Sequence, residues 1–216
     1  MGGMAFRDDS GAVAVQGFLH RRERTDADGL VLAHGAGANC QSALLTALAE
    51  AFYEAGITVL RCDLPFRQAR PSGPPMRGSA EKDQSGLRAA VAALRRETKG
   101  RIFLGGHSYG GRQASMLAAA EPEVAEGLLL LSYPLHPPEK PDQMRTQHFP
   151  SLRTPALFVS GVKDGFGTKE ELKSALKLVP ARTELMMVAS AGHELMAARK
   201  KTDLPERVVK AFLAFV

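Results

Sequence analysis

The stretch from Arg101 to Gly111, which reads R-I-F-L-G-G-H-S-Y-G-G, constrains the fold of this chain more than any other. Its apolar start is typical of a short strand that is buried on both faces. The next residues fit the pattern G-x-S-x-G, and the alanine-rich segment after them predicts a helix. A serine between glycines at such a junction indicates a nucleophile elbow, a sharp turn that exposes the serine hydroxyl. Gly106 and Gly110 would leave room for that turn, because side chains there would clash.

Short apolar runs alternate with amphipathic segments along the rest of the chain. Residues 1–10 predict a loose start or a weak edge strand. Strands are expected at 12–19, 30–33, 57–60, 102–104, 127–131, 156–159 and 184–188. Helices are expected around 44–52 and 87–94, after the serine motif, at 168–178 and near the C-terminus. This alternation predicts an α/β fold with a doubly wound, mostly parallel sheet of about six to eight strands. We expect a single domain over residues 1–216.

Two segments lack any regular periodicity. Residues 67–79 are rich in Pro, Gly and Arg and predict a mobile loop. Residues 133–155 contain six prolines, which remove the backbone donors that a helix needs. The second segment therefore predicts the wall of an open cleft rather than a helical lid.

Composition narrows the classes of partner. The net charge is +5 at pH 7, but basic residues mostly alternate with acidic ones and no zinc-ligand spacing accompanies them. We therefore expect no nucleic-acid partner and no metal site. No apolar run reaches the ~18 residues of a membrane span, so we expect no membrane partner. Cys40 and Cys62 are too few for a disulfide framework, which favours free thiols and a cytoplasmic location.

Three chemically active residues follow separate predicted strands: Ser108, Asp164 and His193. Since the carboxyl ends of parallel strands meet at one edge of a sheet, we expect their side chains to come together there. A neutral serine hydroxyl needs a base to accept its proton, and His193 would serve. Asp164 would hold the imidazole in the productive tautomer. Taken singly, Asp164 could be a turn residue and His193 a capping or surface histidine.

Further candidates surround these three residues. The backbone N–H groups of Tyr109 and Ala36 would form an oxyanion hole, the latter in the glycine loop H-G-A-G-A-N at 34–39. His34 and His107 flank glycine turns, where we expect orienting hydrogen bonds. Both are also candidates for substrate contacts, together with Arg145 from the proline-rich segment.

From His34-Gly35 to His193 the chain resembles the α/β-hydrolase superfamily, which uses the order Ser, Asp, His. The stretches S-Y-P-L-H-P-P at 132–138 and D-G-F-G-T at 164–168 further resemble a small, lidless branch. That branch is related to dienelactone hydrolases, consists mostly of predicted hydrolases and includes a subunit of a histone-acetyltransferase complex. The resemblance implies the α/β-hydrolase fold without a helical cap domain. The nucleophile here is Ser rather than the Cys of dienelactone hydrolases, so that specific activity is not implied.

Two interpretations follow. In the first, the protein is a serine hydrolase that cleaves a small carboxylic ester or thioester through an acyl-enzyme, with no metal or cofactor. In the second, it is a binding or scaffold protein on a hydrolase fold. The complete set Ser108, Asp164 and His193 favours the first, because a scaffold has no physical need for all three. The sequence indicates neither the acyl specificity nor the oligomeric state.

Overall fold

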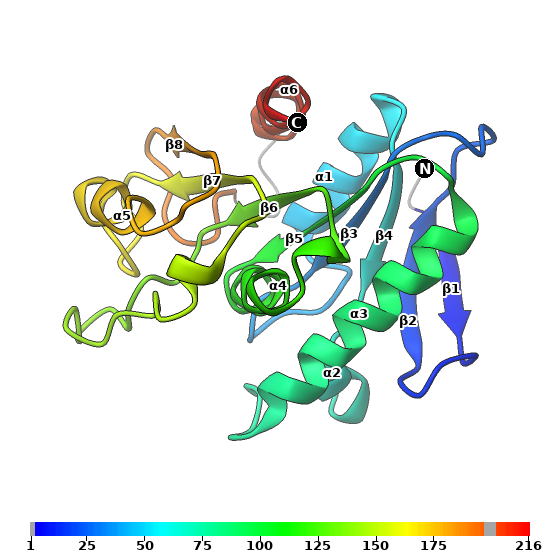
Figure 1. Ribbon diagram of the computed structural model, residues 1–216, viewed down its shortest axis with the longest axis horizontal. Coiled ribbons are helices and arrows are strands. Elements are labelled where there is room, and N and C mark those ends of the chain that lie inside the picture. The colour runs from blue at the N-terminus through cyan, green and yellow to red at the C-terminus, as the bar shows by residue number, and fades with distance from the viewer. Residues whose placement is uncertain (1–2, 197–201) are drawn as a thin grey trace.

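The computed structural model describes residues 3–196 and 202–216, and this part of the chain forms an eight-stranded sheet (Figure 1). The strands are β1 (Met4–Asp8), β2 (Val15–His20), β3 (Gly29–Ala33), β4 (Thr58–Cys62), β5 (Ile102–His107), β6 (Gly127–Leu131), β7 (Ala156–Gly161) and β8 (Thr183–Val188). Their spatial order is β1-β2-β4-β3-β5-β6-β7-β8. Strands β3 to β8 run parallel, whereas β2 lies antiparallel to both β1 and β4. The predicted mostly parallel sheet is confirmed, with β1 as an edge strand.

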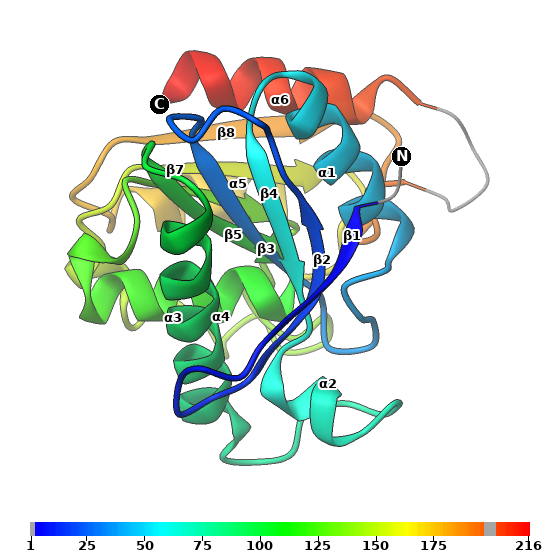
Figure 2. The ribbon, with the colours of Figure 1, turned by 90° about the vertical axis from the view of Figure 1, so that its right-hand side faces the viewer.

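Helices cover both faces of the sheet (Figures 1 and 2). One face carries α1 (Ala43–Glu54) and α6 (Leu204–Phe215), which pack together against one core cluster. The other face carries α3 (Ser79–Glu97), α4 (Tyr109–Ala120) and α5 (Lys169–Leu176), which pack against a second cluster. The chain therefore folds as the predicted doubly wound α/β architecture.

Strand β3 shows why the sheet is buried on both sides. Leu30 and Leu32 belong to the cluster under α1 and α6, whereas Val31 and Ala33 belong to the cluster under α3 and α4. Successive side chains of a strand point to opposite faces, so a continuous apolar run supplies both cores. The central position of this strand follows from that pattern.

The two segments without periodicity differ in outcome. The predicted loop over 67–79 is only partly right, because a short helix α2 (Pro65–Ala69) overlaps its start. Pro65 stands in the first turn of α2, where its fixed φ suits a helix and its missing N–H costs nothing. Five residues are too few to show helical periodicity. Over 133–155, by contrast, the only helical element is the single 3₁₀ turn Phe149–Ser151, so there is no helical cap domain.

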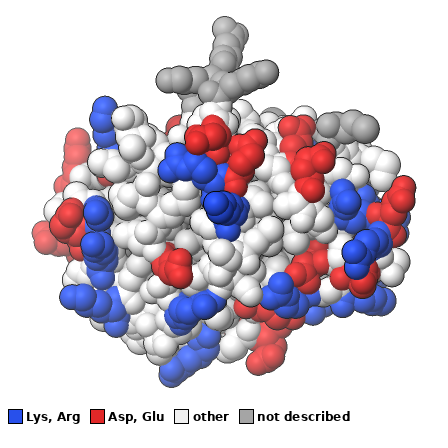
Figure 3. All heavy atoms as spheres, turned by 90° about the horizontal axis from the view of Figure 1, so that it is seen from above, with Lys and Arg blue, Asp and Glu red and all other residues white. Residues whose placement is uncertain are grey.

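The described residues include no helix that is both long and apolar enough to cross a membrane. Figure 3 shows the face on the side of α6, at the top of Figure 1. Outside the grey residues, basic and acidic side chains are interspersed there with uncharged surface, and neither sign gathers into one patch. The excess of positive charge is therefore not concentrated on this face.

The packing of α6 on the sheet yields a first prediction. Phe212 is fully buried, and its ring meets Phe103 and Phe52 edge-on at centroid distances of 5.2 and 5.7 Å. Phe212→Ala should lower the free energy of unfolding by about 3–5 kcal/mol, because it leaves a cavity among aromatic rings. Leu213→Ala, at the half-exposed neighbouring position, should cost less than about 1 kcal/mol. Urea unfolding measures both, and equal losses would contradict this packing.

The cysteines yield a second prediction. Cys40 and Cys62 are both unpaired and buried. Burial raises the pKa of the Cys40 thiol to about 12, and it raises the pKa of Cys62 as well. Since the thiolate is the reactive form, neither thiol should react with a disulfide reagent in the native protein at pH 8. Both should react on addition of denaturant, and an intact mass two hydrogens too low would instead indicate a disulfide.

Candidate active site

The turn between β5 and α4 raises Ser108 at the carboxyl edge of the sheet. Its backbone has φ 50° and ψ −113°, a strained conformation for a residue with a side chain. A Cβ on Gly106 would lie 2.6 Å from the carbonyl oxygen of Ala33, and one on Gly110 would lie 2.6 Å from that of His34. Both distances are too short for real atoms. The prediction that these two glycines leave room for the turn is therefore confirmed.

Three side chains from different strand ends form a hydrogen-bonded series. Ser108 Oγ lies 2.8 Å from His193 Nε2, and His193 Nδ1 lies 3.0 Å from each carboxylate oxygen of Asp164. The Asp164 side chain is 1% exposed, whereas the His193 side chain is 20% exposed. The structure thus brings together the three residues that the sequence singled out. The arrangement can pass a proton from the serine hydroxyl to an imidazole whose other nitrogen faces a buried carboxylate.

Neighbouring groups hold His193 in this orientation. The Phe166 ring stacks on the imidazole with centroids 4.1 Å apart, and the Phe166 N–H donates to Asp164 Oδ1 over 2.9 Å. In addition, His107 Nε2 lies 2.9 Å from the backbone oxygen of His193. Burial lowers the pKa of His107, so its ring is neutral at pH 7 and donates its Nε2–H to that oxygen. The expected orienting bond of His107 is present.

The glycine loop after β3 lies beside the elbow. The Gly110 N–H donates to the His34 oxygen over 3.1 Å, and a Cβ on Gly35 would lie 3.6 Å from the Cβ of Ser108. Within residues 3–196 and 202–216, neither the Ala36 amide nor the Tyr109 amide donates a hydrogen bond. The two predicted oxyanion donors are therefore available on the segments next to the serine.

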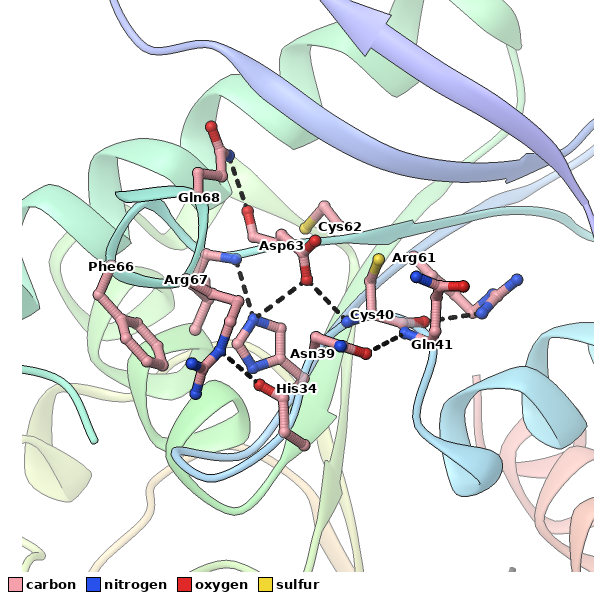
Figure 4. Close-up of polar contacts among 12 residues, drawn as sticks. His34, Asn39, Cys40, Gln41, Arg61, Cys62, Asp63, Phe66, Arg67 and Gln68 are labelled. Carbon is pink, nitrogen blue, oxygen red and sulfur yellow. Dashed lines mark hydrogen bonds and ion pairs between the residues drawn. The ribbon is translucent and has the colours of Figure 1, made fainter. Parts of the chain in front are cut away.

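His34 is buried and forms hydrogen bonds with backbone groups of the protein (Figure 4). Its Nε2 accepts the Leu64 N–H over 3.1 Å, so the hydrogen is on Nδ1, which donates to the Gly35 oxygen over 2.8 Å. Burial lowers the pKa of His34, and the neutral ring forms no ion pair with Asp63, whose oxygen is 3.6 Å away. His34 has no exposed surface. It makes the expected orienting bond, but the expected substrate contact does not fit this placement.

His107 and Arg145 are the two remaining candidates for substrate contacts. His107 is 6% exposed, so its ring offers little surface to a substrate. Arg145 is half-buried, and its guanidinium donates to the Pro134 oxygen over 3.4 Å. It forms no hydrogen bond or ion pair with Ser108, Asp164 or His193 in the described structure. Across the described ranges, no three His, Cys, Asp or Glu side chains are grouped so as to hold a metal ion.

Sequence reasoning missed two buried charged residues behind the site. The fully buried Asp83 accepts the Tyr109 hydroxyl over 2.7 Å and the Phe66 N–H over 3.0 Å. Its position four residues before Leu87, on the apolar face of α3, was an available signal. Arg67 is 6% exposed and donates to carbonyls of the glycine loop. It lies in a Pro- and Gly-rich stretch whose pattern gave no such signal.

Solved structures with this arrangement of strands and helices include several enzymes. Est1E from Butyrivibrio proteoclasticus matches with a TM-score of 0.77 at 17% identity, with 97% of each chain covered. XC6422 from Xanthomonas campestris, described as an α/β serine hydrolase without lid, has a TM-score of 0.71 at 17% identity over 99% of this chain and 94% of the other. A dienelactone hydrolase from Anabaena variabilis has a TM-score of 0.71 at 19% identity, covering 98% and 95%.

At such identities these similarities show the fold alone. A family model described as an alpha/beta hydrolase domain matches residues 26–214, which is most of the chain. That range contains the elbow, the glycine loop and the loops that carry Asp164 and His193. The chain therefore belongs to the alpha/beta hydrolase family.

Proposed function

We propose that this protein is a serine hydrolase that cleaves a small carboxylic ester or thioester through an acyl-enzyme intermediate. The observation that carries the proposal is the continuous hydrogen-bonded series from Ser108 through His193 to Asp164. The strained φ of Ser108 supports it, because such strain persists where the surrounding structure fixes it and it clusters at functional sites.

Acylation begins when Ser108 Oγ attacks the substrate carbonyl carbon. His193 Nε2 takes the hydroxyl proton as the new C–O bond forms, and the carbonyl oxygen becomes an oxyanion. The amides of Ala36 and Tyr109 then donate to that oxygen. When the intermediate collapses, the bond to the leaving group breaks and His193 returns its proton to the departing alcohol or thiol.

Deacylation repeats these steps with water as nucleophile. His193 takes a proton from water, the hydroxide attacks the acyl carbon, and Ser108 leaves with the proton. Asp164 accepts the Nδ1–H throughout, which holds this tautomer and stabilises the imidazolium. Its nearly complete burial strengthens that interaction, since water does not screen it.

The segment 133–155 bears on substrate size. It contributes no lid helix, and XC6422, a structure with the same fold, is described as having no lid. A related structure, Est1E, binds ferulic acid, a small aromatic carboxylic acid. These features favour short, water-soluble acyl groups over long lipid chains.

The triad assignment predicts a defined order of losses. Ser108→Ala should lower the rate of hydrolysis of an activated ester by about 10⁴-fold or more. His193→Ala should lower it nearly as much, because the two residues act as a unit. Asp164→Asn should cost as much or less. Labelling by a fluorophosphonate probe should disappear in Ser108→Ala. Steady-state kinetics with 4-nitrophenyl acetate measures all three losses.

Ser132→Ala is a matched control for Ser108→Ala. Ser132 also follows a strand, has φ 46° and is buried, and its hydroxyl has no hydrogen-bond partner in the described structure. This variant should keep wild-type turnover and probe labelling. If Ser108→Ala kept wild-type turnover, the proposed serine mechanism would be wrong. If the wild type hydrolysed no ester or thioester at all, the binding or scaffold interpretation would replace the enzyme.

The open site predicts a preference for short acyl chains. In a series of 4-nitrophenyl esters from C2 to C16, kcat/KM should be highest among the short chains and should show no jump above the micellar concentration. The reason is that no lid covers the serine to build an acyl tunnel. A steady rise of kcat/KM to C16, or activation at a lipid interface, would contradict the lidless interpretation.

A further inference from the structure

Arg67 of α2 is a buried cation that serves only backbone carbonyls. It is 6% exposed, and no carboxylate pairs with it in the described chain. Its Nε donates to the Ala38 oxygen over 2.8 Å, and its Nη2 donates to both the Ala36 and the Gly73 oxygens, each over 2.9 Å. Its Nη1 donates to the Arg70 oxygen over 3.2 Å. The guanidinium thus joins the glycine loop to the loop that follows α2.

Such a side chain is costly to bury, because a charge removed from water needs compensating partners. The planar guanidinium offers five N–H donors in a fixed geometry, so it can hold several carbonyls at once. Its carbon Cζ also lies 5.0 Å from the centre of the Phe66 ring, which restricts its position. Figure 4 shows Arg67 beside His34, next to the start of the glycine loop.

We propose that Arg67 is a positioning residue for the oxyanion hole, because it holds the backbone of the loop that forms part of it. This inference rests on the proposed hydrolase function. Arg67 would not touch the substrate. It would instead fix the peptide groups of the loop that presents the Ala36 amide to Ser108.

The hydrogen bonds of the loop support this role. The Gly35 oxygen accepts both the Ala38 N–H over 3.1 Å and the His34 ring N–H over 2.8 Å. Since the C=O and N–H of a trans peptide point in opposite directions, these bonds set the direction of the Ala36 amide. Among the described residues, the next peptide accepts a hydrogen bond from Arg67 alone, at the Ala36 oxygen.

Gly37 explains why the hydrogen bond from Arg67 to the Ala36 oxygen matters. A Cβ at Gly37 would meet nothing within 4 Å, so there is open space on that side of the loop. Glycine also has the widest choice of backbone conformations. Without Arg67, the peptide between Ala36 and Gly37 could rotate and displace Ala38, whose N–H donates to the Gly35 oxygen. The peptide that carries the Ala36 amide would then lose one of its two restraints. Loss of Arg67 should therefore weaken transition-state binding more than substrate binding.

The test compares Arg67→Met with Arg61→Met. Arg61 is the matched control, because it is 2% exposed and also donates to protein oxygens. Its acceptors are the Cys40 oxygen and Thr46 Oγ1, which lie outside the glycine loop and the elbow. The readouts are kcat and KM for 4-nitrophenyl acetate and the Ki of a trifluoromethyl ketone. The serine oxygen adds to the carbonyl carbon of such a ketone, and the carbonyl oxygen becomes an oxyanion. Circular dichroism establishes that each variant is folded at the assay temperature.

We expect Arg67→Met to lower kcat by about 10- to 100-fold, less than or equal to the loss for one direct oxyanion donor. Affinity for the ketone should fall by a similar factor, with KM within about twofold of wild type. Arg61→Met should lose stability but keep kcat and Ki within about twofold. Arg67→Lys keeps the charge without the planar geometry and should also lower kcat, and it decides the matter if Arg67→Met does not fold.

Two outcomes would overturn the inference: a folded Arg67→Met (or, if that variant does not fold, Arg67→Lys) with wild-type kcat and Ki, or an equal loss of both in Arg61→Met. Ser108→Ala is assayed in parallel to separate this inference from the function beneath it. If Ser108→Ala is inactive while the Arg67 variants are fully active, only the positioning role fails. If Ser108→Ala is itself active, the proposed hydrolase mechanism fails.

Discussion

The close approach of three backbone segments at the carboxyl edge of the sheet is the constraint on which the site depends. Gly106 and Gly110 allow α4 to begin directly against the end of β3, where a methyl group would meet the Ala33 and His34 oxygens. The hydrogen bond from the Gly110 N–H to His34 then fixes the glycine loop beside Ser108. A side chain at either glycine would separate the serine from the loop that carries the Ala36 amide.

Neutral, buried histidines complete the polar surroundings. His34 holds the glycine loop and His107 holds the backbone of His193, and burial lowers the pKa of both rings. A neutral His107 matters because its ring lies 5.3 Å from that of His193. In the proposed mechanism, His193 becomes positive in the transition state, and a second positive ring at this distance would oppose that change.

A second layer of contacts ties the site to α2 and α3. Asp83 joins the Tyr109 hydroxyl to the Phe66 amide, and the Phe66 and Tyr109 rings meet edge-on at 5.6 Å. Arg67, next along α2, reaches the glycine loop. The helix that bears one proposed oxyanion donor and the loop that bears the other are therefore connected through the five-residue helix α2. These contacts explain why the short segment around α2 has a defined structure.

The sequence by itself determined the sheet, the elbow and the residues that meet there. These features depend on local patterns: apolar runs, glycines with no room for a side chain, and active residues directly after strands. Only the tertiary structure placed His34 out of reach of a substrate and turned Arg67 inward. The hydrogen bonds of Arg67 to the glycine loop join residues 29 and 31 positions apart. Arg67 follows no apolar period and no strand end, so the sequence gives no sign of these contacts, which arise only after packing has brought the segments together.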